Sequence, residues 1–154
     1  MPIAGDGSSA NGPEMAQTGW EHFEHEADIG LRVTAPSRAA VFELMGEALT
    51  AVVTEPASVR SEEERVIDCE APDDSLLLVD WLNGLIYAMA TEHLLFSSWR
   101  VQLDGQRLHG RARGEFVDRR RHQPAVEVKG ATYTALEMQQ GPDGMWRAQC
   151  VVDV

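Results

Sequence analysis

The amino-acid sequence predicts an α+β fold in which two main helices pack on a mixed, mainly antiparallel β-sheet. Two segments repeat apolar residues at intervals of three and four positions, as amphipathic helices do. Several others alternate apolar with polar residues, as half-buried strands do. Both predicted helices lie in the first two thirds of the chain, and only strands and turns are predicted after residue 99. Such segregation of helices from strands is typical of α+β proteins.

The chain of 154 residues is long enough for one domain, and its 44% hydrophobic and 25% charged residues are close to globular averages. Residues 1–19 are rich in Gly, Ser, Ala and Pro, so we expect a flexible N-terminal tail followed by a domain over residues 20–154. The N-terminus lacks the basic and apolar regions of a secretory signal, and no run approaches the ~18 apolar residues of a membrane span. We therefore expect a cytoplasmic protein with no membrane partner.

The first predicted strand covers residues 29–34, where apolar and polar or small residues alternate. Pro36 and Ser37 then open a helix that Pro56 bounds. Its apolar positions recur at three and four residues, which predicts one face packed on a sheet: Val41, Leu44, Met45, Ala48, Leu49 and Val52.

The second predicted strand covers residues 67–71 and ends at Pro72. Asp73 or Asp74 caps the second helix, which continues to about His93. This helix is apolar over more than half of its circumference, so we expect it to be sandwiched between other elements. Asp80 is the charged exception within it, and we expect its side chain to face solvent.

The rest of the chain predicts β-structure. Residues 99–103 and 108–116 flank an Asp104-Gly105 turn, which indicates a hairpin. The small residues of its second strand predict close packing against a large element such as the second helix. Further strands are expected to start at residues 126–128, to lead through 133–138 to a turn at 142–144, and to end with 146–152.

The charge balance restricts the partners of this chain. Acidic residues outnumber basic ones by 25 to 13, so the formal net charge is -12. This charge opposes non-specific binding to nucleic acid or to an anionic bilayer, since both require a basic surface. The two cysteines, Cys69 and Cys150, stand far apart in predicted strands, which favours small buried side chains over a disulfide or a zinc site.

Two groups of residues have the chemistry of metal ligands. The first contains His22, His25 and three acidic residues near the N-terminus, but His22 and His25 project to opposite faces of a strand, so a two-histidine zinc site is disfavoured. The second is the C-terminus, where the side chain of Asp153 and the α-carboxylate of Val154 are adjacent hard oxygen ligands that suit Ca²⁺ or Mg²⁺. The alternative is that the chain end is frayed and solvated.

A basic segment is the third candidate site. Residues 107–129 contain seven cations and three acidic residues, a net charge of +4 within an acidic chain. Such a segment suits the phosphate of RNA or nucleotide, or an acidic protein surface, although solvated arginines would look the same. The candidate partner-binding residues within it are Arg119, Arg120, Arg121, His122 and Lys129. No phosphate-binding loop or nucleophile motif supports independent catalysis.

Several short motifs, taken in order, resemble those of the archease family. They are HEADIG at residues 25–30, DWLN at 80–83, GEFVD at 114–118 with RH at 121–122, EVKGATY at 127–133 and the terminal DV at 153–154. The resemblance extends over residues 20–154. It implies an α+β fold and a role as a protein cofactor of the RtcB-type RNA ligase, promoting guanylylation and multiple turnover in tRNA splicing or RNA repair.

The resemblance also implies a divalent-metal site formed by Asp28, Asp153 and the terminal Val154. We expect Ca²⁺ there ahead of Mg²⁺ or Mn²⁺, and contact with RNA or nucleotide only indirectly, through the ligase. The chain departs from the family pattern at Glu26, where Thr is usual, and at Thr134, where His is usual. The alternatives are a chaperone-like modulator of an RNA-modifying enzyme and a stand-alone metal-dependent phosphohydrolase.

Overall fold

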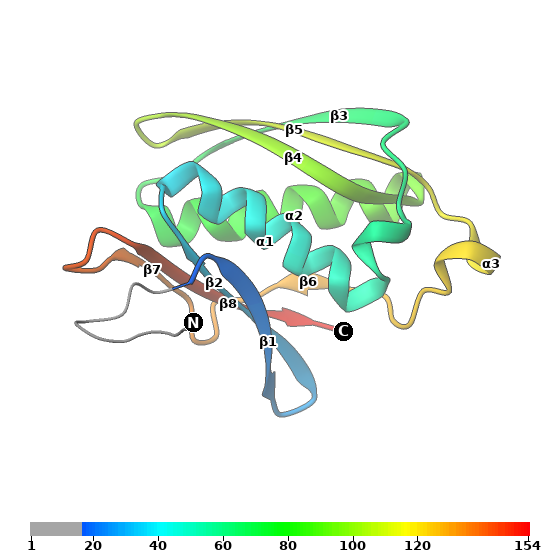
Figure 1. The fold of residues 1–154 in the computed structure, drawn as a ribbon, viewed down its shortest axis with the longest axis horizontal. Helices are drawn as coiled ribbons and strands as arrows, with labels where there is room; N and C mark the ends of the chain where they lie inside the picture. Colours follow the sequence, from blue (N-terminus) through cyan, green and yellow to red (C-terminus); the bar gives the residue numbers. More distant parts are fainter. Residues whose placement is uncertain (1–16) are drawn as a thin grey trace, which may run out of the picture.

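Two β-sheets enclose a layer formed by two long helices (Figure 1). The computed structural model describes residues 17–154, so residues 1–16 of the expected tail lie outside it. The helices are α1 (Arg38–Val53), α2 (Asp74–Glu92) and the short α3 (Arg119–His122), with a 3-10 turn η1 (Pro56–Ser58). The strands are β1 (Gly19–His25), β2 (Asp28–Ala35), β3 (Glu63–Glu70), β4 (Leu94–Asp104), β5 (Arg107–Phe116), β6 (Gly130–Ala131), β7 (Glu137–Gln140) and β8 (Trp146–Asp153).

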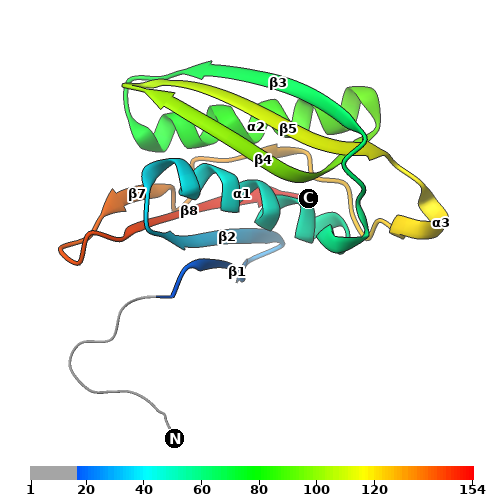
Figure 2. The ribbon, with the colours of Figure 1, turned by 45° about the horizontal axis from the view of Figure 1, so that its top comes forward.

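The larger sheet has the strand order β1-β2-β8-β6, with β7 also paired to β8, and the smaller sheet has the order β3-β5-β4. All strand pairings within residues 17–154 are antiparallel. The prediction of an α+β fold with two main helices on mainly antiparallel β-structure is confirmed, and the strands of the described residues divide into two sheets. Figure 2 shows the two sheets on opposite sides of the helices. Helix α2 therefore has an apolar surface over most of its circumference because it faces both sheets.

The helix boundaries follow from capping residues, as the sequence predicts. The hydroxyl of Ser37 accepts a hydrogen bond from the amide of Ala40 at 3.2 Å, and the carboxylate of Asp73 accepts one from the amide of Leu76 at 2.9 Å. These side chains satisfy amide groups that have no partner within the helix. Helix α2 ends at His93, which adopts the left-handed conformation common at helix C-termini.

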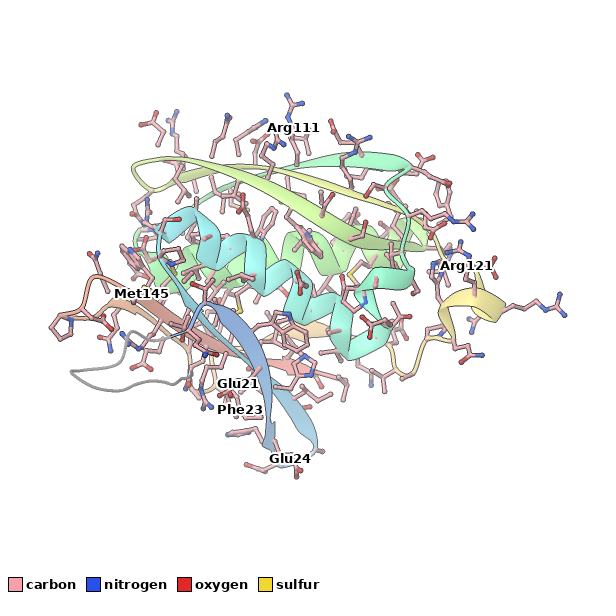
Figure 3. The ribbon with its side chains drawn as sticks, viewed as in Figure 1. Glu21, Phe23, Glu24, Arg111, Arg121 and Met145 are labelled. Carbon is pink, nitrogen blue, oxygen red and sulfur yellow. The ribbon has the colours of Figure 1, made fainter. Side chains whose placement is uncertain are left out.

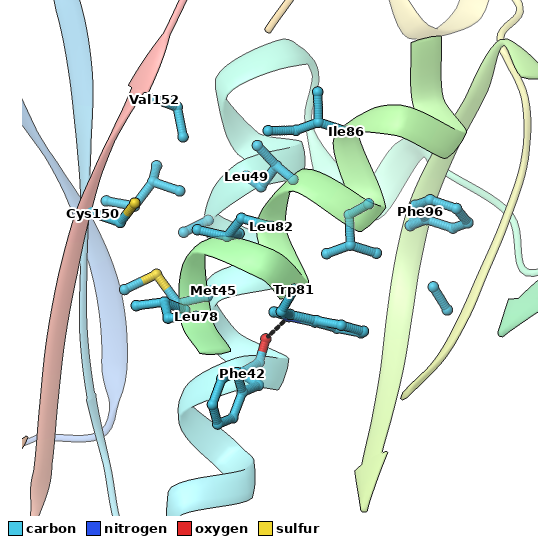
Figure 4. Close-up of a cluster of buried hydrophobic side chains, with 14 of the residues drawn as sticks. Phe42, Met45, Leu49, Leu78, Trp81, Leu82, Ile86, Phe96, Cys150 and Val152 are labelled. Atoms are coloured by element: carbon cyan, nitrogen blue, oxygen red, sulfur yellow. Dashed lines mark hydrogen bonds between the residues drawn. The ribbon is translucent and has the colours of Figure 1, made fainter. Parts of the chain in front are cut away.

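The core between the sheets is built around Trp81 of α2. Its side chain is completely buried, and its indole N–H donates to the carbonyl of Phe42 in α1 at 2.8 Å (Figure 4). A Cβ on Gly110 of β5 would lie 2.3 Å from the Trp81 ring. The small residues of β5 therefore leave room for this ring, as expected, and Asp80 of α2 is exposed to solvent, also as expected.

The cysteines are free, and neither forms a disulfide. Cys150 is fully buried, which confirms the core prediction for this residue, whereas Cys69 is partly buried. Burial raises the pKa of the Cys150 thiol to about 11. Burial, followed by the charges of Asp80 and Asp68, raises the pKa of Cys69 to about 11 as well. Both thiols are therefore protonated and weakly nucleophilic at neutral pH.

The strand predicted to start at residues 126–128 is wrong, because residues 123–129 are irregular. The amide of Ala125 donates to Val53 in α1, at 2.9 Å, whereas the amide of Lys129 donates to Asp153 in β8, at 2.7 Å. The hydrogen bonds of this segment go to two different elements, so no continuous ladder forms. Regular pairing starts only at β6.

Candidate functional site

Asp28 and Asp153 occupy neighbouring strand ends. Asp28 is the first residue of β2 and Asp153 the last of β8, two strands that pair antiparallel. Ile29 pairs with Val152, so the next step of the same register sets Asp28 against Asp153. Residues in directly opposed positions of an antiparallel pair project to the same face of the sheet. The fold thus brings together two carboxylates from opposite ends of the sequence.

Both carboxylates belong to the face of the sheet that is turned away from the helices. Leu31 and Val152 project to the other face of the sheet, where they are completely buried against the helix layer. Asp28 is partly exposed and Asp153 is exposed. Near them, Phe23 of β1 packs so closely over Gly30 that a Cβ on the glycine would lie 2.2 Å from the ring. Gly30 therefore permits a close approach of the Phe23 ring that a larger residue would block.

The end of β8 is held from its other side as well. Gly130 of β6 pairs with Asp153, and the amide of Lys129 donates to the Asp153 carbonyl at 2.7 Å. The side chain of Val154 packs against the core. These contacts fix the backbone on both sides of the Asp153 carboxylate.

The histidines of the N-terminal motif do not converge. Nε2 of His22 lies 2.8 Å from the carbonyl oxygen of Ala48 in α1, on the helix side of the sheet. His25 pairs with Asp28 across the β1–β2 hairpin, so it projects to the opposite face. Within residues 17–154, no three His, Cys, Asp or Glu side chains lie close enough together to hold a metal ion. Asp28 and Asp153 thus need a further donor, and their carboxylate oxygens suit a hard divalent cation.

The three arginines of α3 have unequal environments. Arg121 directs its guanidinium inward to Glu115 of β5 and also donates to the carbonyl of Ser58 at 2.8 Å (Figure 3). Arg119 and Arg120 are exposed. Sequence reasoning grouped the three as partner-binding residues, whereas the structure assigns Arg121 to an internal ion pair.

His122 is also internal, because its side chain is only 3% exposed. Its Nδ1 accepts a hydrogen bond from the amide of Asp118 at 2.8 Å, and its Nε2 lies 2.9 Å from a carboxylate oxygen of Glu115. This network assigns the neutral tautomer with the proton on Nε2. The side chain of Lys129 is exposed to solvent. Of the five expected contact residues, Arg119, Arg120 and Lys129 are accessible to a partner.

Glu115 is the residue of this cluster that sequence reasoning missed. Its carboxylate is buried, and the Arg121 guanidinium holds its pKa down at about 2, with further hydrogen bonds from the Arg60 amide and His122. The alternation along β5 assigns Glu115 to the same face as exposed arginines, so nothing in the pattern marks it as buried. Glu115 is buried because the α3 segment packs over this end of β5.

The sequence model of the Archease protein family (MTH1598/TM1083) matches residues 20–154. Protein archease of Pyrococcus abyssi is 36% identical over 139 residues, which cover 88% of this chain and 98% of that protein. The protein archease of Methanopyrus kandleri is 35% identical over 139 residues, with 88% and 99% covered. The chain belongs to the archease family.

Solved structures agree with this assignment. The solution structure of Methanobacterium thermoautotrophicum protein 1598 superposes on this archease with a TM-score of 0.77 and 32% identity, covering 88% of this chain and 99% of that one. A crystal structure of an archease, possible chaperone, from Thermotoga maritima has a TM-score of 0.55 at 18% identity, covering 92% and 99%. The second likeness supports the fold alone. No helix of residues 17–154 of this archease is long and apolar enough to cross a membrane.

Proposed function

We propose that this archease is a non-catalytic protein cofactor that binds a divalent cation and activates an RtcB-type RNA ligase. It would promote guanylylation and turnover of the ligase in tRNA splicing or RNA repair. Membership of the archease family supports a helper role, as does the description of the Thermotoga maritima relative as a possible chaperone. The observation that carries the proposal is the pairing of β2 with β8, whose register sets Asp28 against Asp153.

The proposed cation ligands are Asp28, Asp153 and the α-carboxylate of Val154. All are carboxylate oxygens, so the set suits Ca²⁺, with Mg²⁺ or Mn²⁺ as alternatives, and disfavours zinc. A bound divalent cation would offset two of the three negative charges of the carboxylates and would supply a Lewis acid at the surface of the sheet. The protein's part is to hold the ligands in place through the β2–β8 register, the Lys129 hydrogen bond and the packing of the Val154 side chain.

The proposed contacts with the ligase include Arg119, Arg120 and Lys129. The segment from α3 to β6 connects the two exposed arginines to Lys129, whose amide is bonded to Asp153. Lys129 thus adjoins the proposed cation site, and Arg119 and Arg120 lie at the start of the same segment. Because the chain as a whole carries a charge of -12, these cations would act through directed contacts with acidic or phosphate-bearing groups of the ligase.

Multiple-turnover ligation by an RtcB-type ligase, with and without this archease, tests the function. We expect stimulation by the parent and its loss in Asp28→Asn and Asp153→Asn. Asp104→Asn is the matched control, since Asp104 is an exposed aspartate at the end of a strand in the other sheet. Full stimulation by both site variants would contradict the metal site and favour a chaperone-like role. Hydrolysis of generic phosphoesters by the archease alone, lost in Asp28→Asn, would instead favour the phosphohydrolase.

A further inference from the structure

The outer face of the smaller sheet is open and carries arginines. The helices cover only its inner face, where Gly110 and Ala112 of β5 are buried (Figure 2). Arg111 and Arg113 alternate with these residues and project outward, as Figure 3 shows for Arg111. Arg100 of β4 is also exposed. The three arginines therefore share one solvent-facing surface.

Two of these arginines are directly opposed. Arg100 pairs with Arg111 in the β4–β5 register. Like charges in directly opposed positions of an antiparallel pair destabilise the sheet. Arg113 lies two residues further along β5, about 7 Å away at the usual rise per residue. The arrangement concentrates three positive charges at one end of the face, in a protein whose net charge is -12.

The other cations of β5 have acidic partners from β3. Arg107 lies 3.6 Å from a carboxylate oxygen of Glu70, and Nδ1 of His109 lies 2.7 Å from Asp68. These pairs match the cross-strand register, in which each partner is directly opposed. At this end of the face, the charges of the two strands compensate each other.

At the other end of the face, the three arginines outnumber the acidic residues, since Glu64, which directly opposes Arg113, is the carboxylate of β3 at this end. Arg111 has one loose ion pair with Glu64, at 3.6 Å. Across residues 17–154, Arg100 and Arg113 have no ion pair with a carboxylate. Their guanidinium groups are thus available to an anion from outside the chain.

A cavity of about 510 Å³ lies over this end of the sheet. Its lining contains the three arginines, the hydroxyls of Ser61 and Ser98, and one carboxylate, that of Glu64, so the arginines leave an excess of positive charge. Cavities of roughly 300–1,000 Å³ are the usual size of small-molecule sites. Guanidinium groups and hydroxyls are donors that proteins use to bind phosphate.

We propose that Arg100, Arg111 and Arg113 form a binding site for a phosphate monoester. The site goes beyond the proposed function, because it lies on the other sheet and shares no residue with the proposed cation ligands. A compact phosphate group fits better than a long polyanion, since the charge of -12 repels an extended nucleic acid. The phosphate belongs either to a nucleotide or to the end of an RNA, two sources with the same chemistry.

NMR titration of the isolated archease with inorganic phosphate and a ribonucleoside 5′-monophosphate tests this site. We expect saturable shifts at the β4 and β5 arginines and an affinity reduced about tenfold or more in Arg111→Gln, since each lost charged hydrogen bond is worth that much. Arg107→Gln is the matched control, because Arg107 lies on the same strand and face but outside the cavity. No saturable binding, or an equal loss in both variants, would overturn the proposal.

Two short RNAs of one sequence distinguish the sources. If the ligand is an RNA end, an RNA with a terminal phosphate will bind more tightly than the nucleotide, and the same RNA with hydroxyl ends will not bind. If the ligand is a nucleotide, the monophosphate will bind at least as tightly as either RNA. Arg100→Gln should also raise the unfolding temperature in phosphate-free buffer, because it removes the repulsion with Arg111. All these measurements are independent of ligase stimulation, so this site and the proposed function can fail separately.

Discussion

The guanidinium of Arg121 donates to both carboxylate oxygens of Glu115, each at 2.7 Å. Glu115 is only 4% exposed and also accepts a hydrogen bond from the amide of Arg60 at 2.7 Å. This pair fastens the α3 segment to the end of β5. It leaves Arg119 and Arg120 as the exposed cations of a run of three.

The Glu115 pair makes folding stability sensitive to acid. Hydrogen bonds from Arg121 lower the pKa of Glu115 from its usual 4.5 to about 2 in the folded protein. The resulting stabilisation is complete above about pH 4.5 and is lost as the pH falls towards 2, because the unfolded state then binds the proton more readily. Its size is about 3 kcal/mol. Urea unfolding between pH 7 and pH 2.5 should show a shallower acid loss in Glu115→Gln than in the parent, with exposed Glu24→Gln as the control. Identical pH dependences for Glu115→Gln and the parent would contradict this prediction.

The sequence predicts those parts of the fold that depend on local chemistry. Ser37 and Asp73 cap the helices as expected, and the small residues of β5 meet Trp81 of α2. Hydrophobic periodicity indicates which face of a helix or strand is buried, but it does not indicate whether the strands form one sheet or two. It also failed at residues 126–128, because the backbone partners of that segment belong to distant elements.

The candidate site was less accessible to sequence reasoning than the fold. The sequence alone places the Asp153 side chain next to the α-carboxylate of Val154. Only the family resemblance connects Asp153 to Asp28, because strand pairing joins residues that are far apart in sequence. The arginine run was recognised, but its members could not be separated. Arg121 differs from Arg119 and Arg120 only through Glu115, whose burial depends on the packing of the loop.

Gly110→Ala should destabilise the core. The added methyl group would lie 2.3 Å from the ring of Trp81, and that ring is held by its hydrogen bond to the Phe42 carbonyl. Overpacking of this kind costs about 1–3 kcal/mol. The midpoint of urea unfolding will measure the loss. Gly105→Ala is unsuitable as a control because Gly105 has a positive φ. Ala57→Gly, at an exposed turn, is the control for a change of one methyl group outside the core.

Glu26→Gly should stabilise the protein. Glu26 lies in the β1–β2 turn with φ of 56°, a left-handed conformation that costs a residue with a Cβ about 1 kcal/mol relative to glycine. Glu24→Gly, in the neighbouring strand, should have the opposite effect because it only adds flexibility to the unfolded chain. Thermal unfolding of both variants will compare them. A lower unfolding temperature for Glu26→Gly would show that the Glu26 side chain contributes more than its backbone strain costs.

A C-terminal extension should weaken cation binding by the proposed site. A few added residues replace the α-carboxylate of Val154 with a neutral amide, whose carbonyl is a weaker ligand for a hard cation. Calorimetric titration with Ca²⁺, Mg²⁺ and Mn²⁺ should show an affinity about tenfold lower or more. The same residues added at the N-terminus are the control, since β1 starts opposite Thr34, at the far end of β2 from Asp28. Equal affinities for the two extended proteins would exclude the α-carboxylate as a ligand.

Replacing Arg119 and Arg120 with Ser should slow association with the ligase, most strongly at low ionic strength. Both side chains are exposed, so their contribution to folding is at most about 1 kcal/mol each, and the Arg121–Glu115 pair that anchors α3 is left intact. Charged groups at the edge of an interface act mainly on the association rate, through long-range attraction that salt screens. Stopped-flow measurements across a salt series should therefore give a rate reduced several-fold to about tenfold at low salt, converging with the parent at high salt. Arg107→Ser, an exposed cation on the smaller sheet, should retain the parent's rate and salt slope. If the double variant also keeps the parent's rate and slope, Arg119 and Arg120 are solvated residues with no part in binding the ligase.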